Sequence, residues 1–178
     1  MSSLKIPYEK IVEGIGKILN NTSRYIKDSK VLLKDGSLEH AVVCAVFAAE
    51  ELAKAGMLSK QFEEHEGEPF IEMPTCDHRR SRFYCHECKL QEAKKLLGDT
   101  LIIESSRLGI ARLPFRLGVD DKEVTHPIRL LCAFVDFEDG EWKFGTPYNP
   151  SMLKLDLLKG IEEKLNEIAT KHGLGEGV

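Results

Sequence analysis

The middle of the chain contains a cluster of basic residues, namely His78, Arg79, Arg80, Arg82, His86 and Lys89. The sequence predicts a helix over residues 77–97, on which Arg79, Arg82 and His86 would share one face. Guanidinium groups bind phosphate and an imidazole transfers protons, as cleavage of RNA by its own 2′-hydroxyl requires. Such cleavage needs no metal ion. The alternative is an amphipathic helix whose basic face pairs with acidic residues elsewhere.

An acidic pair, Glu50 and Glu51, follows the apolar stretch 41–49 and precedes Lys54. Glu50 and Lys54 are four residues apart in the favoured order for a helical ion pair, worth about 0.3–0.5 kcal/mol at a surface. Because the preceding stretch is apolar on every side, at least one of the two carboxylates is expected to be partly buried and to need a partner. We predict that these residues hold the basic helix in place or line a cleft beside it.

Three cysteines and a histidine, Cys76, His78, Cys85 and Cys88, provide soft metal ligands close together in the sequence. They could form a zinc site, but the helix expected here lacks the two paired turns of the usual zinc signature. Zinc is therefore kept as an alternative, and no cofactor is expected. Otherwise Cys85 and Cys88 would be small, partly buried residues.

The elements that would position these residues are mainly helical. Hydrophobic spacing and turn residues predict helices over 7–34, 37–64, 77–97 and 151–172, and a small β-hairpin over about 129–145. A long irregular connection is expected over 98–128. We predict a single mainly α domain over residues 1–172, followed by a mobile tail over 173–178.

Composition limits the classes of function. The chain has 178 residues, 42% of them hydrophobic, and a net charge of −4, so nucleic-acid binding would need a local basic patch. Five cysteines are too few for a disulfide scaffold, and the N-terminus shows no secretory signal. The most apolar stretch is far shorter than the roughly 20 residues of a membrane span. These features predict a cytoplasmic protein that does not associate with membranes.

An ordered set of motifs resembles the AbiV abortive-infection family. The set comprises Ala45-Val-Phe-Ala-Ala-Glu-Glu-Leu-Ala-Lys54, the following His78-Arg79, the earlier segments 16–20 and 32–36, and the closing segment from Ala133 to the final helix. The resemblance covers roughly residues 8–170. That family is similar to the HEPN class of helical domains, so the resemblance implies a HEPN-like helical bundle.

The resemblance also implies a function in phage defence, through an action on RNA or on the translation machinery. HEPN domains often form homodimers, and many are metal-independent endoribonucleases with an Arg-x(4–6)-His motif. Arg79 or Arg80, together with His86, matches this motif, although Arg80 or Ser81 stands where the class often has a polar residue such as Asn. The catalytic residues implied are Arg79, Arg80 and His86, with Glu50, Glu51, Lys54, His78 and Arg82 lining the cleft.

Two alternatives remain open at this stage. One is a non-catalytic helical module that binds a phage or host protein. The other is a helical domain stabilised by zinc on Cys76, His78, Cys85 and Cys88.

Overall fold

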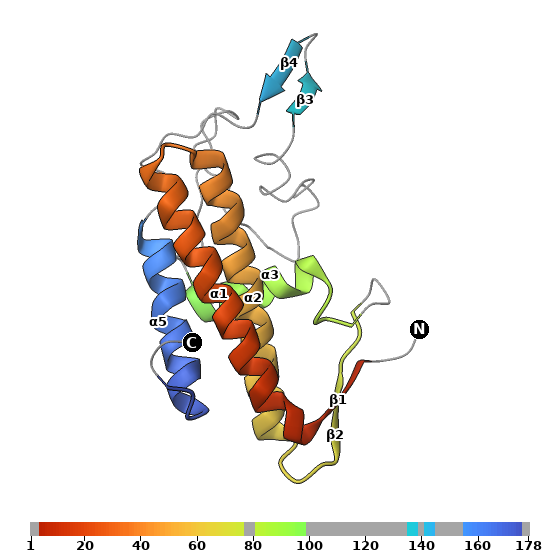
Figure 1. The fold of residues 1–178 in the computed structure, drawn as a ribbon. Coiled ribbons are helices and arrows are strands. Elements are labelled where there is room, and N and C mark those ends of the chain that lie inside the picture. Colours follow the sequence, from red (N-terminus) through yellow and green to blue (C-terminus); the bar gives the residue numbers. More distant parts are fainter. Residues whose placement is uncertain (1–3, 77–80, 99–134, 139–140, 145–154, 176–178) are drawn as a thin grey trace.

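The computed structural model describes residues 4–76, 81–98, 135–138, 141–144 and 155–175. Within them the chain is mainly helical, as predicted (Figure 1). The α-helices are α1 (Ile11–Lys34), α2 (Leu38–Glu64), α3 (His86–Leu97) and α5 (Leu155–Lys171). A short 3-10 helix, Tyr8–Lys10, precedes α1.

Helices α1 and α2 form a long antiparallel pair (Figure 1). The turn between them contains Gly36, whose φ of +79° is readily adopted by glycine. Buried residues of α1 recur every three or four positions, which produces one continuous face: Ile11, Ile15, Leu19, Thr22, Ile26 and Ser29. The predicted end of the first helix and both predicted bounds of the second are confirmed to within one residue, whereas the first helix begins at Ile11, four residues after its predicted start.

Helix α2 is the centre of the bundle, because it contacts α1, α3 and α5. Its first half is lined by small side chains that are almost completely buried, namely Ala41, Val42, Ala45, Val46, Ala48 and Ala49. Small side chains let neighbouring helices approach closely. The sequence-based expectation that this stretch lies inside the bundle is confirmed.

Helix α5 packs against the other three helices along a buried face formed by Leu157, Leu158, Ile161, Leu165 and Ile168. Gly173 follows it with a φ of +64°, and Leu174 then packs against the core beside Gly16. The described part of the predicted tail, residues 173–175, therefore touches the bundle. The predicted start of this helix at residue 151 lies outside the described residues.

A two-stranded ribbon near the N-terminus was not predicted. Strand β1 (Leu4–Pro7) pairs antiparallel with β2 (Phe70–Met73), so Pro7 ends a strand and does not begin a helix. In β2, buried Ile71 and Met73 alternate with exposed Phe70 and Glu72. The alternation could not be recognised in the sequence, because the strand has only four residues and lies between glycine and proline residues that indicate a loop.

The third helix begins at His86, so the prediction of a helix from residue 77 is wrong. The chain leaves β2 extended, Thr75 forms a β-bridge with Ser81, and the Arg82 amide donates to the Pro74 carbonyl at 2.8 Å. Arg82 therefore lies in the turn before α3 and does not share a helical face with His86. Cys85, the residue directly before α3, has an extended backbone conformation.

The predicted hairpin is confirmed as β3 (Val135–Glu138) paired antiparallel with β4 (Glu141–Phe144). The connection predicted over 98–128 lies almost entirely outside the described residues, and so does the part of the first strand predicted over 129–134. None of the helices within the described ranges combines the length and the apolarity that crossing a bilayer requires.

Candidate functional site

The candidate site is built around Glu50, a carboxylate in the interior of the protein. The residue is 2% exposed on α2. Its Oε2 accepts a hydrogen bond from His86 Nδ1 at 2.7 Å and forms an ion pair with Lys89 Nζ, also at 2.7 Å. His86 and Lys89 are three residues apart on α3, so one turn of that helix presents both groups to the same oxygen.

The second carboxylate oxygen of Glu50 is also buried. Oε1 has no hydrogen-bond partner in the part of the chain that the structure describes. An unsatisfied buried acceptor costs about 1–3 kcal/mol. The ion pair between Glu50 and Lys89 therefore has to offset the desolvation of Oε1 as well as the desolvation of the two charges that form the pair. A carboxylate kept in this position at such a cost is typical of a functional site.

The imidazole of His86 differs from its two partners in exposure. Its side chain is 45% exposed, whereas those of Glu50 and Lys89 are 3% and 7% exposed. The carboxylate fixes the orientation of the ring through Nδ1, and no described residue hydrogen-bonds Nε2. An exposed imidazole oriented by a buried carboxylate is suited to proton transfer at Nε2.

Lys54 forms a second connection between α2 and the segment before α3. The predicted ion pair between Glu50 and Lys54 is wrong, because Lys54 pairs with Glu51 instead. Its ammonium group also lies 5.6 Å from the centre of the Phe83 ring, a cation–π distance. Glu50 instead turns toward α3, where Lys89 provides a buried countercharge that the local helix pattern could not reveal.

The predicted site residues are therefore brought together in part. Glu50 meets His86, while Glu51 and Lys54 lie along the same helix and contact each other. Arg82 lies in the turn before α3, and the predicted residues His78, Arg79 and Arg80 lie outside the described ranges. Lys89 belongs to the basic cluster of the sequence but was not predicted to be a site residue. Its three-residue spacing from His86 on one helix is the feature that could have indicated its role.

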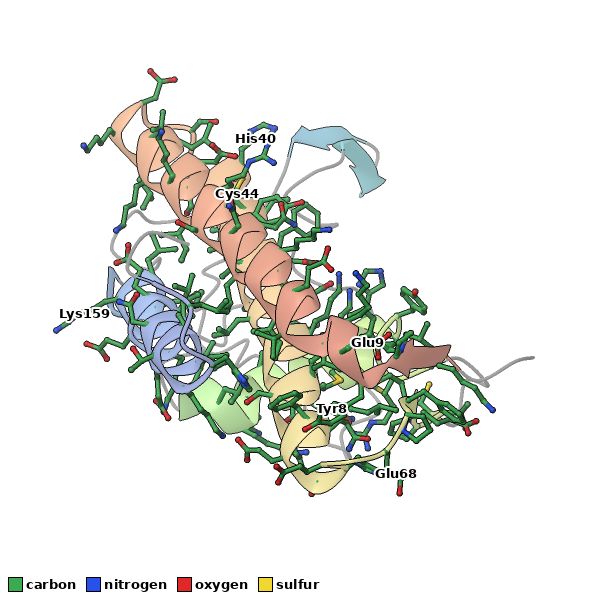
Figure 2. The ribbon with its side chains drawn as sticks, turned by 60° about the horizontal axis from the view of Figure 1, so that its bottom comes forward. Tyr8, Glu9, His40, Cys44, Glu68 and Lys159 are labelled. Carbon is green, nitrogen blue, oxygen red and sulfur yellow. The ribbon has the colours of Figure 1, made fainter. Side chains whose placement is uncertain are left out.

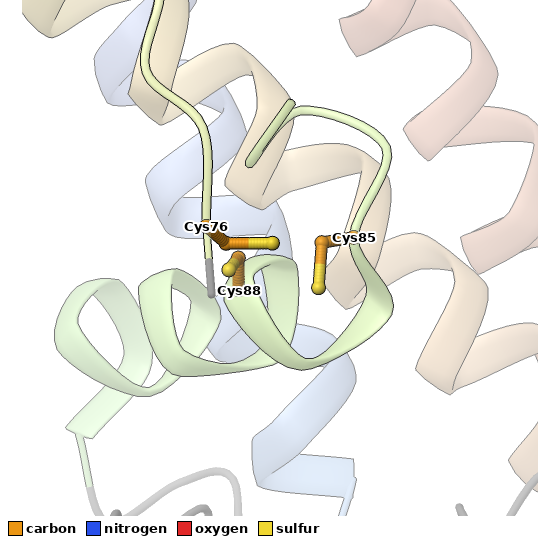
Figure 3. Close-up of side chains that lie close together, drawn as sticks. All are labelled: Cys76, Cys85 and Cys88. Atoms are coloured by element: carbon orange, nitrogen blue, oxygen red, sulfur yellow. The ribbon is translucent and has the colours of Figure 1, made fainter. Parts of the chain in front are cut away.

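Three of the four predicted metal ligands lie together (Figure 3). The sulfur atoms of Cys76, Cys85 and Cys88 are all within 4.8 Å of one another. Cys76 follows β2, Cys85 directly precedes α3, and Cys88 is in its first turn; none is in a disulfide. Burial, followed by the neighbouring sulfurs of Cys85 and Cys76, raises the pKa of Cys88 to about 12. His78 lies outside the described residues.

Comparison with protein families gave a match over most of the chain. The family model HEPN_AbiV, described as AbiV, matches residues 10–146. The matched range includes α1, α2, α3 and the β3–β4 hairpin, and with them Glu50, His86 and the three cysteines. Comparisons with curated proteins and with solved structures gave no match.

Proposed function

Because the chain belongs to the AbiV family, we propose that it acts in abortive infection, by an action on RNA or on the translation machinery of the infected cell. The observation that carries the chemical part of this proposal is the hydrogen bond between exposed His86 and buried Glu50. It gives the bundle an oriented proton-transfer group at its surface.

The chemistry proposed is metal-independent cleavage of RNA. The 2′-oxygen attacks the adjacent phosphorus while a base takes its proton, and the bond from phosphorus to the 5′-oxygen breaks as an acid returns a proton to that oxygen. His86 performs one of these two proton transfers through Nε2. The products are a 2′,3′-cyclic phosphate and a 5′-hydroxyl end.

Arg79 or Arg80 is proposed to bind the scissile phosphate. The support for this role is their sequence spacing from His86, seven and six residues, and the ability of a guanidinium to bind two phosphate oxygens. Glu50 is a positioning residue, because it acts on the substrate only through His86. The protein is further proposed to act in the cytoplasm as a homodimer, which sedimentation of the purified chain tests.

The proposal is tested first in cells, by expressing the chain in a bacterial host and measuring growth and phage plaques. Wild-type protein is expected to arrest growth or reduce plaque numbers, and His86→Ala to abolish the effect. The matched control is His40→Ala, because His40 is exposed in the first turn of α2 (Figure 2) and its Nδ1 lies 3.2 Å from the Ser37 hydroxyl oxygen.

A second test uses purified protein and end-labelled single-stranded RNA in buffer without added divalent metal. We expect cyclic-phosphate ends and no cleavage at a 2′-deoxy position. His86→Ala is expected to slow cleavage by about 10²–10⁴-fold, the usual contribution of a general acid or base. If His86→Ala cleaves RNA as fast as wild type, His86 has no catalytic role.

A non-catalytic interaction module is the second candidate function. It is favoured by the buried ion pair between Glu50 and Lys89, because this contact between α2 and α3 has a structural role that requires no catalysis. In that case growth arrest or phage protection would be the same in wild type, His86→Ala and His40→Ala. The protein would then act by binding a phage or host protein.

A further inference from the structure

The cysteine cluster lies where the segment after β2 meets the start of α3, next to the β-bridge between Thr75 and Ser81. Cys76 ends the extended segment after β2, and Cys85 and Cys88 begin α3 (Figure 3). We propose that these three cysteines bind one zinc ion as thiolates, which fixes the start of α3 to the end of that segment. This proposal does not depend on RNA cleavage.

The distances fit a zinc ion with little movement. Zinc–sulfur bonds are about 2.3 Å long, so two thiolates of a tetrahedral site lie about 3.8 Å apart. The three sulfur atoms are already within 4.8 Å of one another. Shifts of about 1 Å, within reach of χ1 rotation, would bring them to bonding distance from a common centre.

The origin of the ligands also fits a structural metal site. Cys85 and Cys88 are separated by two residues, and they occupy the N-cap and first turn of α3. Zinc binding would displace the thiol protons, because cysteine binds zinc as its thiolate. Cys76 approaches from a different segment, so a bound ion would cross-link the chain. Three thiolates favour a soft or borderline ion such as zinc, whose fourth position is left for another ligand.

The position of the cluster links it to the candidate site. Cys85 and Cys88 alternate along the chain with His86 and Lys89, the two partners of Glu50. One face of the first turn of α3 would therefore hold the metal, and the adjacent face would meet the buried carboxylate. Zinc on the cysteines would set the position of His86 without touching it.

The experiment measures metal content in protein purified without a histidine tag under reducing conditions and supplied with zinc. We expect about one zinc ion per chain in the wild type, retained through dialysis against a weak chelator. Cys88→Ser is expected to lower the retained zinc at least tenfold. Cys44→Ser is the matched control, because Cys44 lies in the first half of α2 (Figure 2) and should leave the zinc content unchanged.

A titration of wild-type protein with cobalt(II) keeps the proposal testable if the cysteine variants fail to fold. Three thiolate ligands should produce thiolate-to-cobalt charge-transfer absorption and tetrahedral ligand-field bands that saturate at about one equivalent. Zinc should then displace the cobalt. Absence of these bands in protein with reduced thiols would overturn the proposal, as would a disulfide among the three cysteines in freshly purified protein.

Discussion

The carboxylate of Glu50 is stabilised in the interior by two groups on α3, and Lys89 depends on it for charge compensation. Removing one member of a buried ion pair leaves the other charge desolvated and costs about 3–5 kcal/mol. We therefore expect Glu50→Ala to lower the free energy of unfolding by about that amount. Glu50→Gln should cost less, because its amide oxygen still accepts from Lys89. Urea denaturation measures both.

Glu13→Gln is the matched control for these two variants. Glu13 is a surface carboxylate of α1 that contacts Lys10 and Lys17, and hydrogen bonds to these lysines lower its pKa to about 2. Water screens these pairs, so the variant should unfold at nearly the same urea concentration as wild type. Similar losses for Glu50→Ala and Glu13→Gln would show that burial of Glu50 has no energetic significance.

The sequence indicated correctly that one of the paired carboxylates would be buried, but it suggested the wrong partner. An apolar stretch that continues up to Glu50 predicts burial, because the helix has no polar face there. The partner could not be predicted from helix spacing, since Lys89 is distant in sequence and comes from a crossing helix. Spacing rules describe neighbours on one helix, whereas buried charges are paired by tertiary structure.

At the scale of elements, long helices with a regular period could be predicted, and short extended segments could not. The buried positions of α1 recur regularly from Ile11 to Ser29, so its period is unmistakable. In contrast, β1 and β2 have four residues each, and their pairing joins distant parts of the chain. The segment before α3 carries helix-compatible residues, yet its described part, residues 81–85, forms a turn that begins at the β-bridge between Thr75 and Ser81.

Two glycines in the long helices allow a comparison of helix propensity with packing. A Cβ at Gly14 would lie 3.6 Å from Leu58, an ordinary contact, whereas one at Gly56 would lie 2.8 Å from Leu96 of α3. Gly14→Ala should therefore stabilise the protein by about 0.5–1 kcal/mol. Gly56→Ala should stabilise less or destabilise, because Leu96 must move. Thermal unfolding compares the variants, and an equal gain for both would contradict the close α2–α3 approach.

The end of α5 should make stability depend on pH. His172 Nε2 lies 2.8 Å from the Ser59 hydroxyl of α2. Burial, followed by the charge of Lys171, lowers the pKa of this histidine, and the charge of Glu63 opposes the shift. The folded state thus favours the neutral ring. Above pH 6.5, the ordinary histidine pKa, the ring is neutral in both the folded and the unfolded chain, and His172 takes nothing from the stability. As the pH falls below this value, the unfolded chain binds more protons than the folded one, and the free energy of unfolding decreases.

Replacing His172 by glutamine keeps a polar group beside Ser59 and removes the titration. We expect His172→Gln to lose less stability than wild type between about pH 7.5 and pH 5.5. The measurement is the free energy of unfolding in urea at both pH values. His40→Gln, at an exposed position, should keep the pH dependence of wild type. A steeper loss in His172→Gln than in wild type would reverse the sign argued here.

At the scale of the whole molecule, the core extends beyond the part of the chain that the family model matches. The match ends at residue 146, while α5 begins at Leu155 and supplies a complete buried face to α1, α2 and α3. Without this helix, the facing apolar residues of the other three would be exposed to water. We infer that α5 belongs to the same cooperative unit as the helices that hold the candidate site.

Ile161→Ala tests this inference, because Ile161 is completely buried on α5. Loss of a buried isoleucine typically costs about 2–5 kcal/mol, and in one cooperative unit the entire unfolding transition should shift by that amount. Lys159→Ala, at an exposed position on the same helix (Figure 2), should have little effect. Circular dichroism measures the transition, and amide exchange compares α5 with α1. If Ile161→Ala speeds exchange in α5 while α1 keeps its protection, α5 unfolds separately and the bundle does not depend on it.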